Sequence, residues 1–435
     1  MKTKLMIIII LISLVSIFIY FGRTAIISTT GQTIPEKLAK KIPENTKTWI
    51  KKTFFTSQTL RLDIRNQNQE IEQLRLRENA KNKLVIEKFK KIPLELRDKF
   101  GTNNDKYKLK LFQTKFLANG KNDFAVASGY VDIFQENLIF VTGDALIFKI
   151  KLSDLNIPKK GFYADLISTN LKNIIKTGGF FKKSYFGIKD LTIIDNKIFL
   201  SFSNEVKKNC FNTGILIADL DLNNLNFEKH SLSETDCALV GDMDNALQGG
   251  RIVKLSDKEI FFTHGDWFQG NSAQDKKSIF GKILKYNFIN RTYEIVSYGH
   301  RNPQGLYYLK DKNILIETEH GPIGGDEVNI IDLRNKTLEK NYGWPIASYG
   351  KGTQQNAGVL SSGTKNYKNH DGYIEPIKYY VPSIGISEIL KIPNKFFKNE
   401  NTNENLFIAT LGTKISEGDL SLHHLQINGD YNKIL

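Results

Sequence analysis

Three polar residues stand close together in one short segment. Arg301, Asn302 and Gln304 occur in Gly-His-Arg-Asn-Pro-Gln-Gly-Leu, residues 299–306, where Gly and Pro are dense. Arginine carries a planar, permanently charged guanidinium that binds carboxylates or phosphates, and the amides add directional donors and acceptors. These residue types predict a site for an anionic ligand, carried by loops on a rigid scaffold.

A second polar segment follows, Glu-His-Gly-Pro-Ile-Gly-Gly-Asp-Glu-Val-Asn at residues 319–329, and a third, Asn-Tyr-Gly-Trp-Pro, occupies residues 341–345. Asp326 and Glu327, with nearby carbonyl groups, have the hard oxygen donors that calcium prefers. The alternative is that all three segments form turns between strands, in which Asp and Asn cap backbone groups.

The elements that must position these residues are short strands. After Gly101, apolar runs of strand length alternate with turns rich in Gly, Asn and Asp, a pattern typical of an antiparallel sandwich, barrel or propeller. One loose phrase recurs about every 50–60 residues, as expected for four-stranded propeller blades. The predicted strands are 109–116, 138–140, 145–150, 191–202, 214–218, 259–263, 283–286, 314–316, 328–331 and 406–410.

The three polar segments resemble those of the glucose/sorbosone dehydrogenase family, whose members are aldose sugar dehydrogenases that use pyrroloquinoline quinone (PQQ) on a six-bladed β-propeller. The resemblance extends in the same order over about residues 107–430. Further similar phrases are Phe186–Leu191, Leu247–Ile252, Gly265-Asp266, Ala273–Asp275 and Gly281–Leu284.

This resemblance implies an all-β, six-bladed β-propeller whose last blade is incomplete. It implies that Arg301, Asn302 and Gln304 lie against PQQ, and that the carbonyls of Gly321 and Pro322 hold a calcium ion. A divalent cation and an arginine together neutralise the carboxylates of such a cofactor. The implied reaction is oxidation of the anomeric hydroxyl of a small sugar to a lactone, with an electron acceptor that the sequence does not identify.

The sequence departs from the family pattern at the position of the family's catalytic base. The family has a histidine where this chain has Leu247, and leucine cannot accept a proton, so the catalytic residue stays unassigned. Gly412 also stands where the family has a lysine that contacts the cofactor. The alternative is therefore a non-catalytic propeller that binds a sugar or a protein. Losing a general base costs a rate factor of about 10²–10⁴.

The N-terminal part has a different composition. Leu5–Phe21 is an uncharged apolar run preceded by Lys2 and Lys4, which predicts a membrane anchor over residues 1–22. A cleaved signal peptide is the alternative, although no small-residue cleavage site follows the run. Basic residues before the run predict that the propeller lies outside the inner membrane, in the periplasm. Residues 23–100 are expected to form a basic, helical stalk, and residues 101–435 the propeller.

The charge distribution bears on nucleic-acid binding. The 435-residue chain has a net charge of +15, but residues 1–110 hold 23 Lys and Arg against 10 Asp and Glu, whereas the remainder holds 38 against 36. The nearly neutral propeller and the lack of nucleic-acid-binding motifs argue against a nucleic-acid partner.

The chain has two cysteines, Cys210 and Cys237. An even number in an exported domain predicts a disulfide. The alternative is two unpaired thiols.

Overall fold

The computed structural model describes residues 91–101, 108–113, 129–143, 145–155, 161–175, 187–239, 247–350, 369–393, 403–411 and 421–435. The expected anchor and residues 23–90 of the expected stalk lie outside this part of the chain, as does Gly412. Among the residues that are described, no helix is long and apolar enough to cross a membrane. All described elements belong to the unit Leu76–Leu435.

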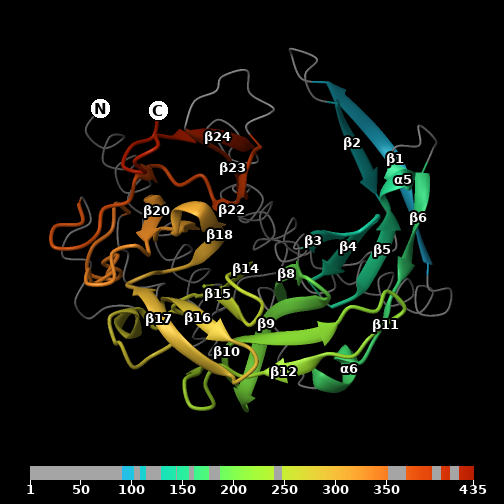
Figure 1. The fold of residues 1–435 in the computed structure, drawn as a ribbon, viewed down its shortest axis with the longest axis horizontal. Coiled ribbons are helices and arrows are strands. Elements are labelled where there is room, and N and C mark those ends of the chain that lie inside the picture. Colours follow the sequence, from blue (N-terminus) through green and yellow to red (C-terminus); the bar gives the residue numbers. More distant parts are fainter. Residues whose placement is uncertain are drawn as a thin grey trace, which may run out of the picture. The chain divides into compact units, whose positions relative to one another are not determined.

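Five antiparallel sheets form the blades of a β-propeller in the described part of the chain (Figure 1). Blade 1 contains β3 (Gly129–Phe134), β4 (Asn137–Thr142), β5 (Ile147–Lys151), β6 (Gly161–Leu166), β1 (Lys91–Gly101) and β2 (Lys108–Gln113). Blade 2 contains β8 (Ile188–Ile194), β9 (Lys197–Lys207), β10 (Cys210–Asp219) and β12 (Glu228–His230), with β13 (Ala238–Leu239) also on β10.

Blade 3 contains β14 (Gly249–Lys254), β15 (Glu259–His264), β16 (Lys282–Asn287) and β17 (Thr292–Tyr298). Blade 4 contains β18 (Pro303–Leu309), β19 (Ile314–Glu319), β20 (Asp326–Asp332) and β21 (Lys378–Tyr380). Blade 5 contains β22 (Ile386–Lys391), β23 (Glu404–Thr410) and β24 (Leu422–Ile427). The first strand of each blade is innermost: β3 contacts β8, β8 contacts β14, β14 contacts β18, and β18 contacts β22.

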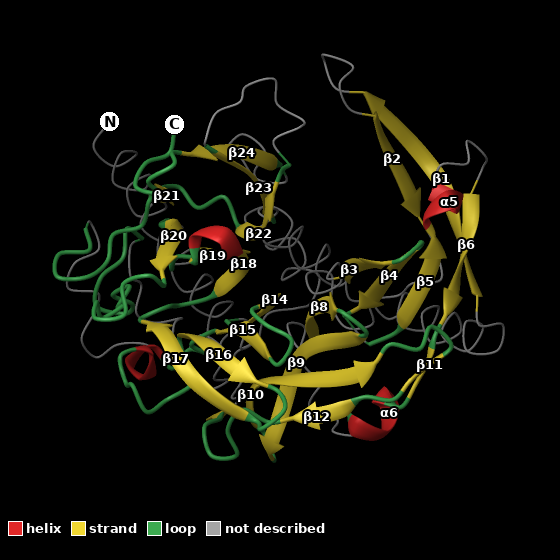
Figure 2. Ribbon diagram, in the orientation of Figure 1, coloured by secondary structure: helices red, strands yellow, loops and turns green. Residues whose placement is uncertain are grey.

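In the described residues the helical segments are short, as Figure 2 shows. They are α5 (Leu152–Leu155), α6 (Leu171–Ile174) and the single 3₁₀ turns η1 (Gly270–Ala273) and η2 (Lys310–Lys312). A small parallel pair, β7 (Ser168–Thr169) with β11 (Asn224–Leu225), links the loops of blades 1 and 2. The all-β propeller predicted from the sequence is therefore confirmed.

The expected number of six blades is wrong for the described residues. The pairing of β1 with β6 explains the difference. β1 is aligned with β6 from Lys91↔Asp165 to Glu95↔Gly161, and it also pairs with β2. The strands before residue 167 thus merge into one six-stranded sheet instead of two blades. β2 pairs with β1 and lies at the edge of this sheet, so it is not part of blade 5. Residues 91–100, expected to end a helical stalk, are a strand.

The core lies between adjacent blades. Phe199 and Ile215 of blade 2 pack in one cluster with Ile260 and Leu284 of blade 3, and all four side chains are completely buried. The β8–β9 connection turns at Asp195, whose φ of 52° suits the short polar side chains that tolerate the left-handed region. Each apolar run predicted after residue 137 coincides with at least one observed strand.

The predicted disulfide is also present. Cys210, at the start of β10, is bonded to Cys237, with 5.2 Å between their Cα atoms. The bond fixes the loop that returns from β12 to β13 against blade 2.

Candidate functional site

Two loops on blades 3 and 4 bring three of the predicted site residues, Arg301, Gly321 and Pro322, together. The β17–β18 connection carries Arg301 and Asn302, and the β19–β20 connection carries His320. The amide of His320 donates to the carbonyl of Asn302 at 3.2 Å. The amide of Arg301 donates to Oε2 of Glu319 at 2.6 Å. These bonds fix the two loops relative to each other.

The Arg301 side chain lies in the middle of this arrangement. Its Nη1 donates to the carbonyls of His320 at 3.1 Å and Gly321 at 2.7 Å, and its guanidinium lies 5.4 Å from the centre of the Trp344 ring. The Nε atom is buried and has no hydrogen-bond partner among the described residues. Burial lowers the pKa of Arg301, although Asp266 opposes the shift, and the side chain stays charged. Arg301 therefore has unused capacity to donate to an anion.

Asp266 contacts both Arg301 and the tryptophan ring beside it. Its Oδ2 accepts from the Trp344 indole at 2.7 Å, its Oδ1 accepts from the amide of Phe268 at 2.9 Å, and its own amide donates to the carbonyl of Arg301 at 2.8 Å. The carboxyl is completely buried. Burial raises the pKa of Asp266 to about 7, although attraction to Arg301 opposes the rise. Asp266 thus fixes the indole on which Arg301 lies.

A small pocket opens beside Arg301. Its walls are made by the two loops and by the turn that carries Trp344, and they comprise Arg301, Glu319, His320, Gly321, Pro322, Gly325, Glu327, Tyr342, Trp344, Ala347 and Ser348. Three of the five predicted site residues, namely Arg301, Gly321 and Pro322, therefore line one pocket. An anionic, partly planar ligand would meet a guanidinium, an indole and backbone carbonyl groups there.

Asn302 and Gln304 form hydrogen bonds with blade 3. Oδ1 of Asn302 accepts from the amide of Gly249 at 3.2 Å and from Nε2 of Gln304 at 2.9 Å. The carbonyl of Gln304 accepts a hydrogen bond from Nε of Arg251. Asn302 through its side-chain oxygen and Gln304 through its backbone carbonyl thus link the start of β18 to β14.

The Gly321–Pro322 loop is compact. A Cβ atom at Gly321 would lie 2.3 Å from the carbonyl oxygens of Gly324 and Gly325, so a side chain has no room there. Asp326 accepts from the amide of Gly321 at 3.1 Å through Oδ1, and from the amides of Ile384 and Ile386 at 3.1 and 3.0 Å through Oδ2. Asp326 thus anchors the loop to blade 5.

Two buried residues, Leu247 and His264, bear on the prediction that leucine replaces the family's base histidine. Leu247 is buried, and its carbonyl accepts from the amide of Trp267 at 2.9 Å. His264 is completely buried: its Nε2 accepts from the amide of Thr213 at 3.1 Å, and its Nδ1 lies 2.8 Å from the carbonyl of Gly265. Burial lowers the pKa of His264 to about 3. Both nitrogens are used, so His264 is a neutral structural residue.

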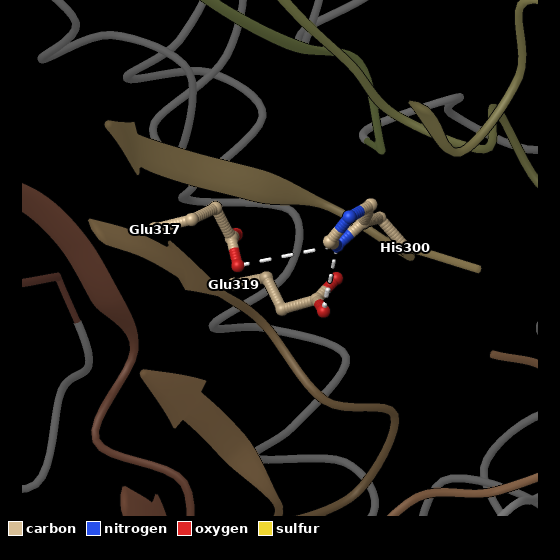
Figure 3. Close-up of side chains that lie close together, drawn as sticks. All are labelled: His300, Glu317 and Glu319. Carbon is tan, nitrogen blue, oxygen red and sulfur yellow. Dashed lines mark hydrogen bonds and ion pairs between the residues drawn. The ribbon is translucent and has the colours of Figure 1, made fainter. Parts of the chain in front are cut away.

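Sequence reasoning had not assigned roles to Asp266, Trp344, His300, Glu317 or Glu319. Figure 3 shows the last three close together. The alternation of acids in Ile-Leu-Ile-Glu-Thr-Glu, residues 314–319, was a usable signal, because alternate residues of a strand share one face. Asp266 and Trp344 meet only through the fold, as they are 78 residues apart.

The sequence model of the family described as Glucose / Sorbosone dehydrogenase matches residues 187–431, which is more than half of the chain. The chain belongs to this family. Its propeller is similar to the crystal structure of the soluble aldose sugar dehydrogenase from Escherichia coli in its apo form, with a TM-score of 0.50 and 20% identity, covering 70% of this chain and 84% of that one.

The chain is also similar in sequence to two sugar dehydrogenases. It is 38% identical over 115 residues to an aldose sugar dehydrogenase of Escherichia coli (strain K12), covering 23% of this chain and 30% of the relative. It is 32% identical over 133 residues to quinoprotein glucose dehydrogenase B of Acinetobacter calcoaceticus, covering 23% of this chain and 27% of the relative. The chain thus spans less than a third of the length of these relatives.

Proposed function

We propose that this chain binds PQQ in the pocket beside Arg301 and oxidises the anomeric hydroxyl of a small sugar. The observation that carries the proposal is the buried Nε of Arg301, which has no partner among the described residues, in a side chain that lines the pocket. Charged donors of this kind bind carboxylates strongly. The family membership and the quinoprotein relative support the choice of cofactor.

The residues present fit such a group. Arg301 would hold a cofactor carboxylate, and Trp344 would offer a flat apolar surface beside it. The Gly321 carbonyl, now 2.7 Å from the Arg301 guanidinium, already faces a cation. We propose that calcium binds to the carbonyls of Gly321 and Pro322 once Arg301 pairs with the cofactor. Asn302 and Gln304 would then hold β18 in position against β14.

PQQ, when bound, supplies a two-electron acceptor for the hydride of the sugar. The proton of the sugar hydroxyl needs a base, which Leu247 cannot provide. We assign this role to His320, because it lines the pocket and its Nδ1 lies 3.9 Å from Oδ1 of Asp326. Burial lowers the pKa of His320, so its imidazole is neutral at pH 7 and able to accept a proton.

A second candidate is a non-catalytic propeller that binds its ligand without turnover. The buried Leu247 at the position of the family's base favours it. Only the first candidate requires PQQ and predicts electron transfer to an artificial dye acceptor, because the second binds a sugar or a protein.

The experiment is a titration of the full chain with PQQ in the presence of calcium, followed by absorbance, and then dye reduction with a panel of aldoses. Saturable binding with dye reduction supports the dehydrogenase, and binding alone supports the non-catalytic candidate. Arg301→Gln should weaken PQQ binding about 10- to 100-fold, whereas Arg334→Gln, at an exposed pair with Asp332, should not. Lack of saturable binding would exclude the dehydrogenase and leave a non-catalytic propeller that binds a sugar or a protein.

We further propose that the propeller is exported and held at the inner membrane by the apolar run over residues 5–21. The disulfide between Cys210 and Cys237 supports an oxidising compartment. The intact mass of the protein from the membrane fraction tests this: a chain that retains residues 1–22 supports the anchor, and one that begins near residue 25 shows a cleaved signal peptide.

A further inference from the structure

A buried cluster of three potential metal ligands lies next to the pocket and has no role in the proposed reaction. It consists of His300, Glu317 and Glu319, whose exposed fractions are 0%, 0% and 4%. Figure 3 shows both carboxylates directed toward the imidazole. Burying two acids this close is unfavourable unless a positive charge accompanies them.

The strand register accounts for the crowding. Glu317 and Glu319 lie on one face of β19, and on β20 they are paired with Asn329 and Glu327. Like charges directly across an antiparallel pair destabilise it. Glu327 is neutralised by His370, whose Nε2 lies 3.1 Å from Oε1 of Glu327. Within the described residues, the ion-pair contact of Glu317 is with His300 alone, at 4.0 Å.

The hydrogen bonds of the described residues do not provide every polar atom of this cluster with a partner. Nδ2 of Asn329 lies 3.0 Å from Glu317, 3.2 Å from Glu319 and 3.4 Å from Glu327, so two N–H groups face three carboxylates. Oε1 of Glu317 and Oδ1 of Asn329 are buried and have no hydrogen-bond partner in the part of the chain described. Such atoms are rare in native proteins and indicate an additional group. A proton on Glu317 would remove one charge and still leave Oδ1 of Asn329 without a donor.

The distances suit a metal ion. Nδ1 of His300 lies 3.4 Å from Oε1 of Glu319 and 4.0 Å from Oε2 of Glu317, and the three atoms all lie within 4.8 Å of one another. An ion bonded at about 2.0–2.2 Å to each ligand separates neighbouring ligands by about 3–4 Å. Nε2 of His300 contacts Oγ of Ser297 at 2.8 Å, which orients the ring as the outer partners of metal-bound histidines do.

We propose that His300, Glu317 and Glu319 bind a divalent first-row transition-metal ion such as Mn²⁺. The imidazole ligand distinguishes this site from the calcium site proposed at Gly321 and Pro322, since calcium takes oxygen ligands only. Glu319 also lines the pocket, which gives the ion a path to the cluster. The ion neutralises the acids of β19 and fixes the strand that leads into the His320 loop.

The test uses the full chain after treatment with a chelator. Mn²⁺ is added in the presence of excess Ca²⁺, and bound Mn²⁺ is followed by electron paramagnetic resonance. We expect one Mn²⁺ that excess Ca²⁺ does not displace and that shows coupling to the imidazole nitrogen. Glu317→Gln should weaken its binding by at least about tenfold, the smallest effect typical of a lost metal-site partner. Glu404→Gln, which changes a buried acid of β23 paired with Lys391, should bind Mn²⁺ like the wild type.

Thermal melting shows whether each variant is folded and whether Mn²⁺ stabilises it. Mn²⁺ should raise the Tm of the wild type and of Glu404→Gln, because a ligand that binds only the folded state stabilises it, and should raise that of Glu317→Gln less at the same concentration. If Glu317→Gln does not fold, His300→Gln takes its place. Absence of a calcium-resistant Mn²⁺, or equal affinity in the wild type and both cluster variants, would overturn the proposal and leave a protonated Glu317 as the explanation.

Discussion

The Nη1 atom of Arg251 on β14 lies 3.0 Å from Oδ1 of Asp190 on β8. The same atom lies 2.6 Å from Oε2 of Glu388 on β22. Arg251 also donates through Nε to the carbonyl of Gln304 on β18, and its guanidinium lies 5.2 Å from the centre of the Tyr130 ring on β3. One side chain therefore contacts the innermost strand of each of the other four blades.

Replacing Arg251 should destabilise the propeller strongly. Burial by itself would lower the pKa of Arg251, but attraction to Glu388 and Asp190 raises it, so the charge is held firmly. Arg251→Met leaves Asp190 buried without its cation, which costs about 3–5 kcal/mol of unfolding free energy. Urea denaturation measures this cost. Lys254→Met, at an exposed pair with Asp195, is the control and should change stability little; equal effects of the two variants would contradict the role of Arg251.

Asp266 should make stability depend on pH. Because burial raises its pKa to about 7 in the folded chain, from 3.8 in an ordinary environment, the folded state binds more protons between these values. The stabilising contribution is complete below about pH 4 and is lost as the pH rises through about 7.

Asp266→Asn removes this titration. The stability of the wild type relative to Asp266→Asn should fall by up to about 1.4 kcal/mol per pH unit between pH 4 and 7. Denaturant unfolding at several pH values measures the difference, and the constant cost of a mismatched amide hydrogen bond cancels. A difference that does not vary with pH would show that Asp266 is ionised throughout the range.

Loss of the disulfide should weaken blade 2. The bond between Cys210 and Cys237 spans a sequence separation of 27, and closing a loop of this length stabilises the folded state by roughly 3 kcal/mol on the chain-entropy estimate. The double variant Cys210→Ala/Cys237→Ala should therefore have a lower Tm than the wild type under oxidising conditions. Addition of a reductant should lower the Tm of the wild type alone, and a reductant-insensitive wild type would refute the prediction.

His320→Gln tests the assigned base. Removing a general base lowers turnover about 10²–10⁴-fold while PQQ affinity stays close to that of the wild type. Because burial lowers the pKa of His320, wild-type activity should persist below pH 6.5, where an ordinary histidine is protonated. His424→Gln, on β24 beside Asn405, is the matched control.

The complementary variant is Leu247→His, which places an imidazole where the sequence resemblance predicts the family's histidine. It should raise the turnover of His320→Gln if the position faces the sugar. No gain in rate would show that the Leu247 side chain lies away from the reacting hydroxyl.

Local features of the fold could be predicted from the sequence, because alternating apolar residues and polar turns act within a few residues. The number of blades could not, since it depends on whether β1 pairs with β6, some 70 residues later. The same limit applies to the site. Arg301 was recognisable by its residue type and segment, whereas the support from Asp266 depends on contacts between blades that only the folded chain creates.

The pairing of β1 with β6 also decides where this propeller can be cut. A protein shortened to begin at residue 101 would lack β1 and would leave the strand Gly161–Leu166 with an unpaired edge. Exposed strand edges recruit other chains and promote aggregation. Lys91–Gly101 is thus part of the folded unit, and a shortened form of the protein must retain this strand.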